Sequence, residues 1–346
     1  MERYTGKRVG PVLLVLAAAV RLLTAAGPET VEAKQKTGDL LYQAAAMGTG
    51  TVPMTADKQA KDTVWVVRQR PEMPEVLPAD PEPAPEEVPD QPACQTPVFA
   101  AAEAEDIAVA GRCTYKVDKA SLLLAPTAPF SAEEGPRVLI LHTHTSEAYT
   151  QSAGWFYEET DPMRTLQPDQ SVVRVGAEIA AVLEEAGIGV IHDTSYNDYP
   201  DYNSSYSGAG KKTARWLEQY PSLQVVLDIH RDAVEAADGT PVHMVTELPD
   251  GTEAARLMLV VGTDQGGAQH PDWEKNLSWA LKVQALLERS SPGLCRSLDL
   301  RTERFNQHLS PMAMLVEVGS TGNTMPEALA AARVLAETLT KLIPSS

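Results

Sequence analysis

From Pro136 onward, short apolar runs alternate with longer amphipathic stretches, and this alternation most constrains the fold. Apolar runs of roughly four to eight residues are typical of buried strands, whereas apolar residues recurring every three or four positions are typical of helices. Strands that alternate with helices form βαβ units around a mostly parallel sheet. The sequence therefore predicts that residues 130–346 form an α/β domain, with a mostly parallel, twisted sheet flanked by helices.

The expected elements follow one another with short connections. Strands are expected in the runs 137–145, 188–193, 223–232, 256–263 and 313–320. Helices are expected over 171–187, 211–220, 273–290 and 326–343. The first of these helices has an apolar stripe and closes at Gly187, a residue typical of helix ends.

The start of the chain has a different character. Arg3, Lys7 and Arg8 precede an apolar run over residues 10–20, the pattern of an export signal. With Arg21 reaching to the interface, this segment is also long enough to stay in the bilayer as an anchor. We therefore expect residues 1–28 to be a signal or anchor segment. The rest of the protein would lie at the extracytoplasmic face of the cell membrane, or be secreted if the segment is cleaved.

Three further regions lead to the α/β domain. Residues 29–70 contain helical composition and predict a juxtamembrane helical region. Residues 71–97 hold nine prolines, with seven acidic and no basic residues between Pro71 and Asp90, and predict an extended, self-repelling linker. Residues 98–129 predict a small N-terminal module or extension. Cys94 and Cys113 would either form a disulfide after export or remain two separate thiols.

The charge excludes one class of function. The chain carries 29 basic and 47 acidic residues, a net charge of −18, and residues 130–346 account for 16 and 30 of them. A nucleic-acid-binding protein needs a basic face to neutralise phosphates, so we expect no nucleic-acid partner. All seven histidines lie between His142 and His308, which places the expected chemistry in the α/β domain.

Polar side chains stand where three expected strands end. His142, His144 and Glu147 follow the first strand, His230 ends the third and Glu317 lies in the last. In open α/β sheets, ligands bind beyond the carboxyl ends of the strands. Two histidines and a carboxylate leave an open position on a tetrahedral zinc ion, whose bound water has a pKa of about 7. The sequence therefore predicts a Zn²⁺ site, with Glu317 as the catalytic proton acceptor.

Each histidine taken singly has a more ordinary reading. A histidine at a strand end is more often a hydrogen-bonded structural residue than a ligand, and only the coincidence of three strand ends favours a metal. His142 and His144 both remain candidates for the first ligand. His192, at the end of the second strand, is expected to be a surface or groove residue.

Five strings in this order resemble the stage II sporulation protein P family: VLILHTHTSEAYT, GVIHDTSYNDYPDYNSSY, VVLDIHRDAV, RFNQHLSP and AMLVEVGSTGNT. The resemblance covers roughly residues 136–342, together with the anchor and linker layout. Members of this family are membrane-anchored peptidoglycan hydrolases of spore-forming bacteria, similar in fold to zinc-dependent N-acetylmuramoyl-L-alanine amidases.

The resemblance implies an amidase that uses Zn²⁺ to cleave the amide between N-acetylmuramic acid and L-alanine. It also implies a further endopeptidase activity on stem-peptide cross-links. Expected partners are peptidoglycan, the membrane, and proteins of the sporulation protein D and M types during engulfment.

Carried over by position, the resemblance assigns His230 as a metal ligand and Glu317 as the catalytic glutamate. It favours His144 as the ligand from the first strand, with His142 as the alternative. The amidase carboxylate ligand normally lies at the start of the following helix, where this chain has Asp169 and no glutamate, so Glu147 becomes the candidate. Contacts to substrate are expected from six further residues: Arg231, Asp232, Tyr202, Asn203, Asn306 and Gln307.

Two other functions remain open. A zinc-dependent glycan deacetylase would use the same set of histidines and carboxylates. A wall-binding module without catalytic activity would need no metal at all.

Overall fold

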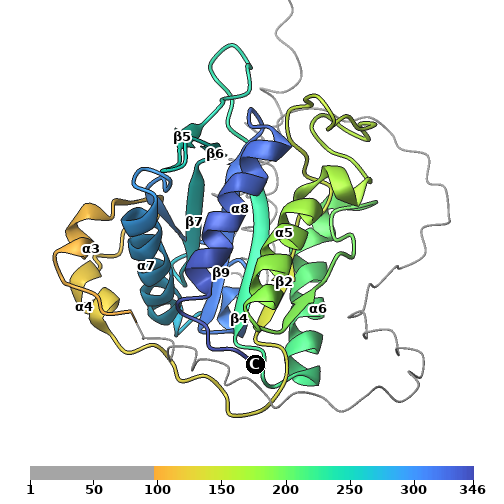
Figure 1. Cartoon of the computed structure of the whole chain (residues 1–346). Coiled ribbons are helices and arrows are strands. Elements are labelled where there is room, and N and C mark those ends of the chain that lie inside the picture. The colour runs from red at the N-terminus through yellow and green to blue at the C-terminus, as the bar shows by residue number, and fades with distance from the viewer. Residues whose placement is uncertain (1–96) are drawn as a thin grey trace, which may run out of the picture. The chain divides into compact units, whose positions relative to one another are not determined.

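A seven-stranded sheet forms the centre of residues 97–346, the part of the chain that the structure, a computed structural model, describes (Figure 1). In spatial order its strands are β1 (Val109–Ala110), β8 (Leu298–Arg301), β7 (Leu257–Gly262), β9 (Met312–Ser320), β4 (Val225–Asp232), β2 (Val138–Leu141) and β3 (Val190–His192). All neighbouring strands are parallel except β7 and β9, which pair antiparallel. The predicted mostly parallel sheet with flanking helices is confirmed.

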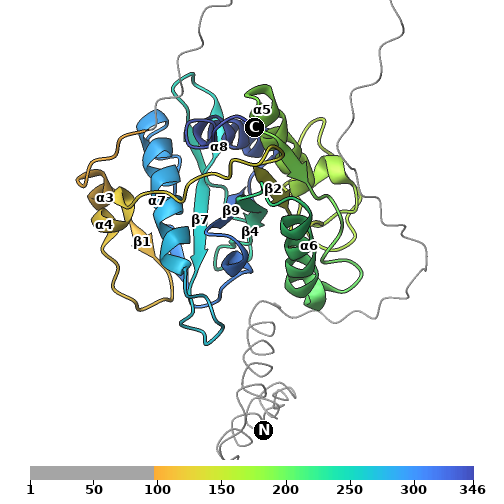
Figure 2. The ribbon, with the colours of Figure 1, turned by 90° about the horizontal axis from the view of Figure 1, so that it is seen from below.

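The helices lie on both faces of this sheet (Figure 2). One face packs against α5 (Val172–Glu185), α7 (Trp273–Ser290) and α8 (Met325–Leu339), and the other against α6 (Ser205–Gln219). The side chains of β2 pack alternately into the two cores on either side of the sheet. Val138 and Ile140 belong to the first core, and Leu139 and Leu141 belong to the second. This alternation follows from the two-residue period of a strand.

The ends of α5 and α8 are fixed by local sequence. The Ser171 side chain accepts a hydrogen bond from the backbone N–H of Val173 at the start of α5. Gly187 follows the helix with a φ of 76°, a conformation that favours glycine. Helix α8 begins with a capping box, in which the Thr324 side chain bonds the backbone of Glu327 and the Glu327 carboxylate bonds the backbone of Thr324. Both helices start next to the segments that follow β2 and β9, since the Val172 N–H of α5 donates to the Glu147 carbonyl at 2.8 Å and α8 begins at Met325, soon after β9 ends at Ser320.

Most expected elements occur at their predicted positions. Helix α7 spans Trp273–Ser290, and β2, β3, β4 and β7 fall within the predicted runs. Helix α6 begins at Ser205, six residues before the expected start at residue 211. Its first turns were not predicted because they are polar, contain glycine and carry no apolar stripe. Strand β8 and the hairpin of β5 (Val245–Glu247) and β6 (Glu253–Ala255) were not predicted.

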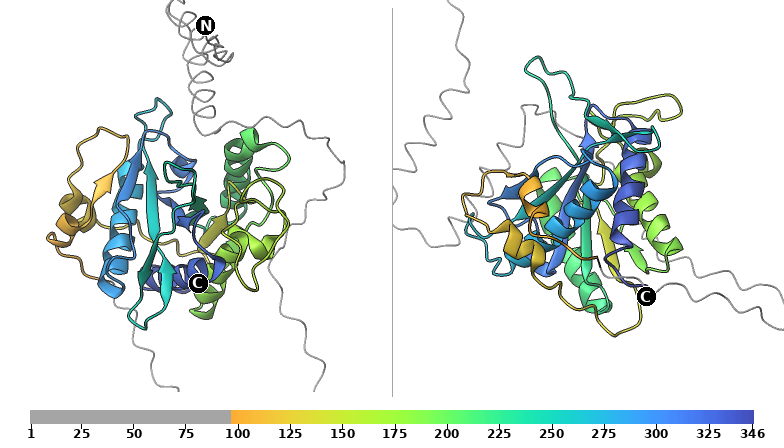
Figure 3. Two further views of the ribbon diagram at one scale, coloured as in Figure 1. Left: turned by 90° about the horizontal axis from the view of Figure 1, so that it is seen from above. Right: turned by 60° about the vertical axis from the view of Figure 1, so that its left-hand side comes forward.

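Residues 98–129 lie along α7 at one edge of the sheet (Figure 3). They contain α3 (Glu103–Asp106), β1 and α4 (Lys119–Leu124). Strand β1 pairs with β8, and Arg289 of α7 donates to the Glu103 carboxylate at 2.7 Å and to the Val98 carbonyl at 2.7 Å. This segment thus supplies the edge strand of the same sheet.

The predicted signal or anchor at 1–28, the helical region at 29–70 and the linker up to residue 96 lie outside the described residues, as does Cys94. Within residues 97–346, no helix is both long and apolar enough to cross a bilayer.

Candidate metal centre

The order of the strands brings the predicted site residues together. Strand β4 lies between β2 and β9, so the segment after β2 comes next to the carboxyl end of β4. The register of β4 and β9 places His230 opposite Glu317. The pairing becomes irregular between His230 and Asp232, as a β-bulge would make it, and such irregularities commonly re-aim side chains next to functional sites.

His144, Glu147 and His230 form a buried group that could hold a metal ion. One ligand atom from each of them lies within 4.8 Å of the others. Glu147 Oε2 and His230 Nδ1 are 3.6 Å apart. Two ligands about 2.0–2.1 Å from a tetrahedral zinc would lie about 3.4 Å apart, so this spacing suits zinc. The buried Nδ1 of His144 has no hydrogen-bond partner, as expected of a nitrogen prepared for a metal.

His142 lies apart from this group. Its Nδ1 is 3.0 Å from the Ile229 carbonyl oxygen, and its Nε2 is 2.9 Å from Nε2 of His192. The imidazole rings of both histidines pack beside Gly176 of α5, where a Cβ atom would come within 2.8 Å of them. The geometry therefore favours His144 over His142 as the ligand from the β2 segment.

Asp228 orients His230 and was not predicted from the sequence. Its Oδ1 is 2.9 Å from His230 Nε2. The Thr143 backbone N–H and hydroxyl both donate to the same carboxylate, at 2.7 and 2.6 Å. Histidines that bind metals commonly place their second nitrogen against a carboxylate, which fixes the ring. The sequence contained a signal for this contact: Asp228 and His230 are two residues apart on the expected strand, and such residues lie on the same face.

The site concentrates negative charge around His230. Burial acts to lower the pKa of this histidine, but the carboxylates of Asp228, Glu147 and Glu317 outweigh it and raise the pKa to about 10. Burial, followed by the positive charge of His230, lowers the pKa of His144 well below its usual value. A histidine held neutral in this way can donate its lone pair to a cation.

Glu317 lies opposite His230 on β9 and is half-buried, in a strand whose other residues are all buried. Its Oε2 is buried and has no hydrogen-bond partner. Burial raises the pKa of this carboxyl to about 8, against the positive charge of His230. A buried carboxylate oxygen without a hydrogen bond is costly, so its presence here points to a role in chemistry.

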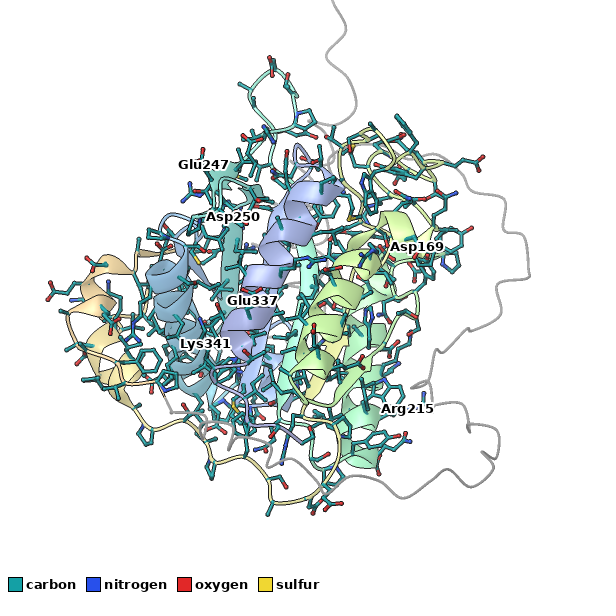
Figure 4. The ribbon with its side chains drawn as sticks, viewed as in Figure 1. Asp169, Arg215, Glu247, Asp250, Glu337 and Lys341 are labelled. Atoms are coloured by element: carbon teal, nitrogen blue, oxygen red, sulfur yellow. The ribbon has the colours of Figure 1, made fainter. Side chains whose placement is uncertain are left out.

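The carboxylate of Glu147 is held from two sides. Its Oε2 accepts the backbone N–H of Arg231 at 3.1 Å, and its Oε1 lies 3.6 Å from Nη2 of Arg164. Asp169, the other carboxylate considered at this point of the chain, is exposed near the start of α5 (Figure 4). Arg164 was missed by the sequence analysis because it lies in an irregular connection that has no periodic pattern.

The residues predicted to contact substrate have varied surroundings. Arg231 donates to the backbone carbonyls of Ala148 and Met163, both at 2.7 Å, and Asp232 pairs with Arg296 at 2.7 Å. These bonds tie Arg231 and Asp232 to neighbouring loops, and the carboxylate next to His230 Nε2 is that of Asp228.

The remaining four residues divide into two groups. Tyr202 stacks on the His144 ring with 4.6 Å between ring centroids, and Asn203 follows it in the chain. Asn306 donates to the Tyr206 carbonyl, and the buried Gln307 bonds the backbone of β7 at both ends of its amide. Tyr202 thus contacts the metal group, whereas Gln307 attaches the segment between β8 and β9 to β7. Substrate contact by any of them stays a prediction.

A family model described as stage II sporulation protein P matches residues 78–340. The chain belongs to this family. Stage II sporulation protein P of Bacillus subtilis (strain 168) is 27% identical over 216 residues, which cover 59% of this chain and 50% of that protein. The match thus spans about half the length of this curated relative. The family resemblance of the sequence motifs is confirmed, and with it a role in sporulation.

Among solved structures, the chain is similar to a conserved protein of unknown function. It aligns with a TM-score of 0.30 and 14% identity, over 61% of this chain and 64% of that one. A likeness this weak does not establish a shared fold. The similarity to zinc amidases stays a prediction.

Proposed function

We propose that this member of the family is a zinc-dependent peptidoglycan hydrolase that cleaves the amide between N-acetylmuramic acid and L-alanine. The observation that carries the proposal is the buried His144, Glu147 and His230 group with Glu317 beside it. A family role in sporulation is consistent with hydrolysis of the cell wall.

The residues of the site divide the chemical work. A zinc ion held by the three ligands would supply a Lewis acid and an acidified water. Glu317 is the group suited to take a proton and return it to the leaving amine, because its Oε2 has no competing hydrogen bond. Asp228 keeps the His230 ring in place throughout.

We further propose that the protein acts at the extracytoplasmic face of the membrane, held by its N-terminal segment or secreted after cleavage. Its partners would be peptidoglycan and proteins of the sporulation protein D and M types. The net charge of −14 over residues 130–346 would favour a basic partner, through an attraction that weakens with rising salt.

Product analysis tests the activity. Purified peptidoglycan is incubated with the zinc-loaded full chain, and the soluble products are identified by mass spectrometry. Stem peptides with a free L-alanine amine, released from uncut glycan strands, are the expected products. His230→Ala should abolish their release. His243→Ala, at an exposed histidine paired with Glu327, should leave it unchanged.

Other products would identify the alternatives. Acetate released with every stem peptide still attached would replace the amidase with a glycan deacetylase. Binding to the wall without any released product, by a protein that holds no zinc, would replace it with a binding module. Cleavage within stem-peptide cross-links, in addition to the amidase products, would show the expected endopeptidase activity.

A further inference from the structure

The irregular connection between β2 and α5 is tied to the ligand segment around Glu147. The Ala148 N–H donates to the Met163 carbonyl at 2.9 Å, and the Thr165 N–H donates to the Ser146 carbonyl at 2.8 Å. These bonds place Arg164 opposite Glu147 as in an antiparallel bridge. The backbone of Arg164 is therefore fixed next to the site, although it lies in no helix or strand.

The guanidinium of Arg164 joins three polar side chains at this position. Nη1 donates to Asp198 Oδ2 at 2.8 Å and to the Ser146 hydroxyl at 3.1 Å, and Nη2 lies 3.6 Å from Glu147 Oε1. The Asp198 side chain has no solvent exposure, and that of Arg164 is 18% exposed. A carboxylate buried this deeply needs a positive partner, and Arg164 provides it.

Arg164 also reaches the second ligand through an aromatic ring. Its Cζ lies 4.9 Å from the centroid of the Tyr202 ring, within the range of a cation–π contact. The Tyr202 ring is stacked on His144 with an interplanar angle of 3°, and its hydroxyl is 3.3 Å from His144 Nε2. One side chain therefore contacts Glu147 directly and His144 through Tyr202.

We propose that Arg164 is a positioning residue of the metal centre, which fixes the Glu147 carboxylate and holds Tyr202 against His144. The inference rests on the proposed function, because it assumes that these residues bind the metal. A planar guanidinium can bond two carboxylates and stack on a ring at the same time, whereas an ammonium group can do so only as a point charge. Lysine should therefore not replace it.

The test compares Arg164→Lys with Arg174→Lys in the full chain. Arg174 is the matched control, because its guanidinium also pairs with a buried carboxylate, that of Glu178 on α5 at 2.8 Å, and neither side chain belongs to the metal group. Each protein is stripped of metal and titrated with Co²⁺, whose visible absorption reports the ligand geometry. Arg164→Lys should bind Co²⁺ about 10–100-fold more weakly, with an altered spectrum, as expected when support of a ligand is lost. Arg174→Lys should match the wild type.

A second variant separates positioning from simple neutralisation of Asp198. Arg164→Lys combined with Asp198→Asn removes the buried negative charge, so a folding defect of the single variant should be relieved. The inference requires that Co²⁺ affinity remains weakened in the double variant. Full recovery of the affinity and spectrum would show that Arg164 only neutralises Asp198, and would overturn the proposal.

The remaining outcomes distinguish this inference from the proposed function. Wild-type affinity and spectrum in Arg164→Lys, in a protein that still hydrolyses peptidoglycan with bound metal, would overturn the role of Arg164 only. A wild-type chain that binds no Co²⁺ and no Zn²⁺ would overturn both.

Discussion

At the scale of single residues, the candidate site consists of a few ligands and the groups that orient them. His230 and Asp228 lie two residues apart on β4 and so share one face of the sheet. Thr143 holds Asp228 from the segment that carries His144. The histidine from one strand is thus oriented through the loop that supplies the other ligands.

Replacement of Asp228 tests this orientation. Asp228→Asn keeps the shape of the side chain but removes the charge that faces His230 Nε2, and zinc affinity should fall about 10–100-fold. Competition with a zinc chelator measures the affinity. Asp193→Asn is the control, because the Asp193 carboxylate accepts from Trp216 at 2.8 Å and lies outside the metal group. Equal zinc affinity in Asp228→Asn and wild type would remove Asp228 from the site.

Glu317 should matter for turnover and not for metal. Glu317→Gln preserves size but cannot accept a proton, so release of stem peptides should fall about 10²–10⁴-fold. Zinc content should stay at the wild-type value, because Glu317 is not part of the ligand group. Glu337→Gln, on the exposed side of α8 (Figure 4), should change neither quantity. Turnover in Glu317→Gln within a few-fold of wild type contradicts the assigned role.

At the scale of elements, α5 packs closely against the paired imidazoles of His142 and His192. Gly176 makes this possible, since a Cβ atom at this position would lie 2.7 Å from the His192 ring. The same packing keeps His142 on the α5 side, away from His144. Gly176 therefore helps determine which of the two histidines faces the metal group.

Gly176→Ala should destabilise the protein although alanine is the better helix former. Overpacking costs about 1–3 kcal/mol, whereas the gain in helix propensity is about 1 kcal/mol. Unfolding in urea measures the difference. In Gly208→Ala of α6, where the nearest atom to the new Cβ would be 3.4 Å away, the propensity gain should prevail. If Gly176→Ala is as stable as the wild type, α5 can move away from the two imidazoles at no cost, and the close packing at Gly176 is not required.

Helix α7 contains a buried lysine, Lys282, which lowers the stability of the folded protein. Lys282 is 4% exposed and donates to the Ser278 hydroxyl at 2.7 Å, and burial lowers its pKa to about 8. Lys282→Met should raise the free energy of unfolding at pH 7 by about 1 kcal/mol, or the melting temperature by roughly 2–4 °C.

The pH dependence of this difference has a definite sign. Between pH 8 and the pKa of an unfolded lysine, about 10.4, the unfolded chain binds more protons at this residue than the folded one. Wild-type stability should therefore rise with pH in this window relative to Lys282→Met, and the advantage of the variant should shrink. An advantage that is constant from pH 7 to 10 would show that Lys282 is not charged at a cost.

At the scale of the whole molecule, periodicity predicted the fold class and the elements with long apolar patterns. It did not predict β8, whose sequence LDLR is short and half charged, nor the antiparallel direction of β7, which depends on pairing between distant segments. The meeting of the carboxyl ends of β2, β4 and β9 was predictable, because the carboxyl ends of parallel strands lie at the same edge of a sheet.

The choice between His142 and His144 was not predictable from alternation. Strand β2 ends at Leu141 and a turn follows, so the two-residue period no longer applies at these positions. Their placement depends on α5 and on the loop that contains Tyr202, which are set by tertiary packing. The position of Arg164 next to Glu147 also depends on tertiary packing, and so it was not predictable from the sequence.

The most direct test of the central claim is an anomalous difference map recorded at the zinc edge, from crystals of the zinc-loaded protein. The account predicts one strong peak about 2.0–2.2 Å from ligand atoms of His144, Glu147 and His230. A peak between His142 and His192, or zinc bound elsewhere with none at the three ligands, would contradict it.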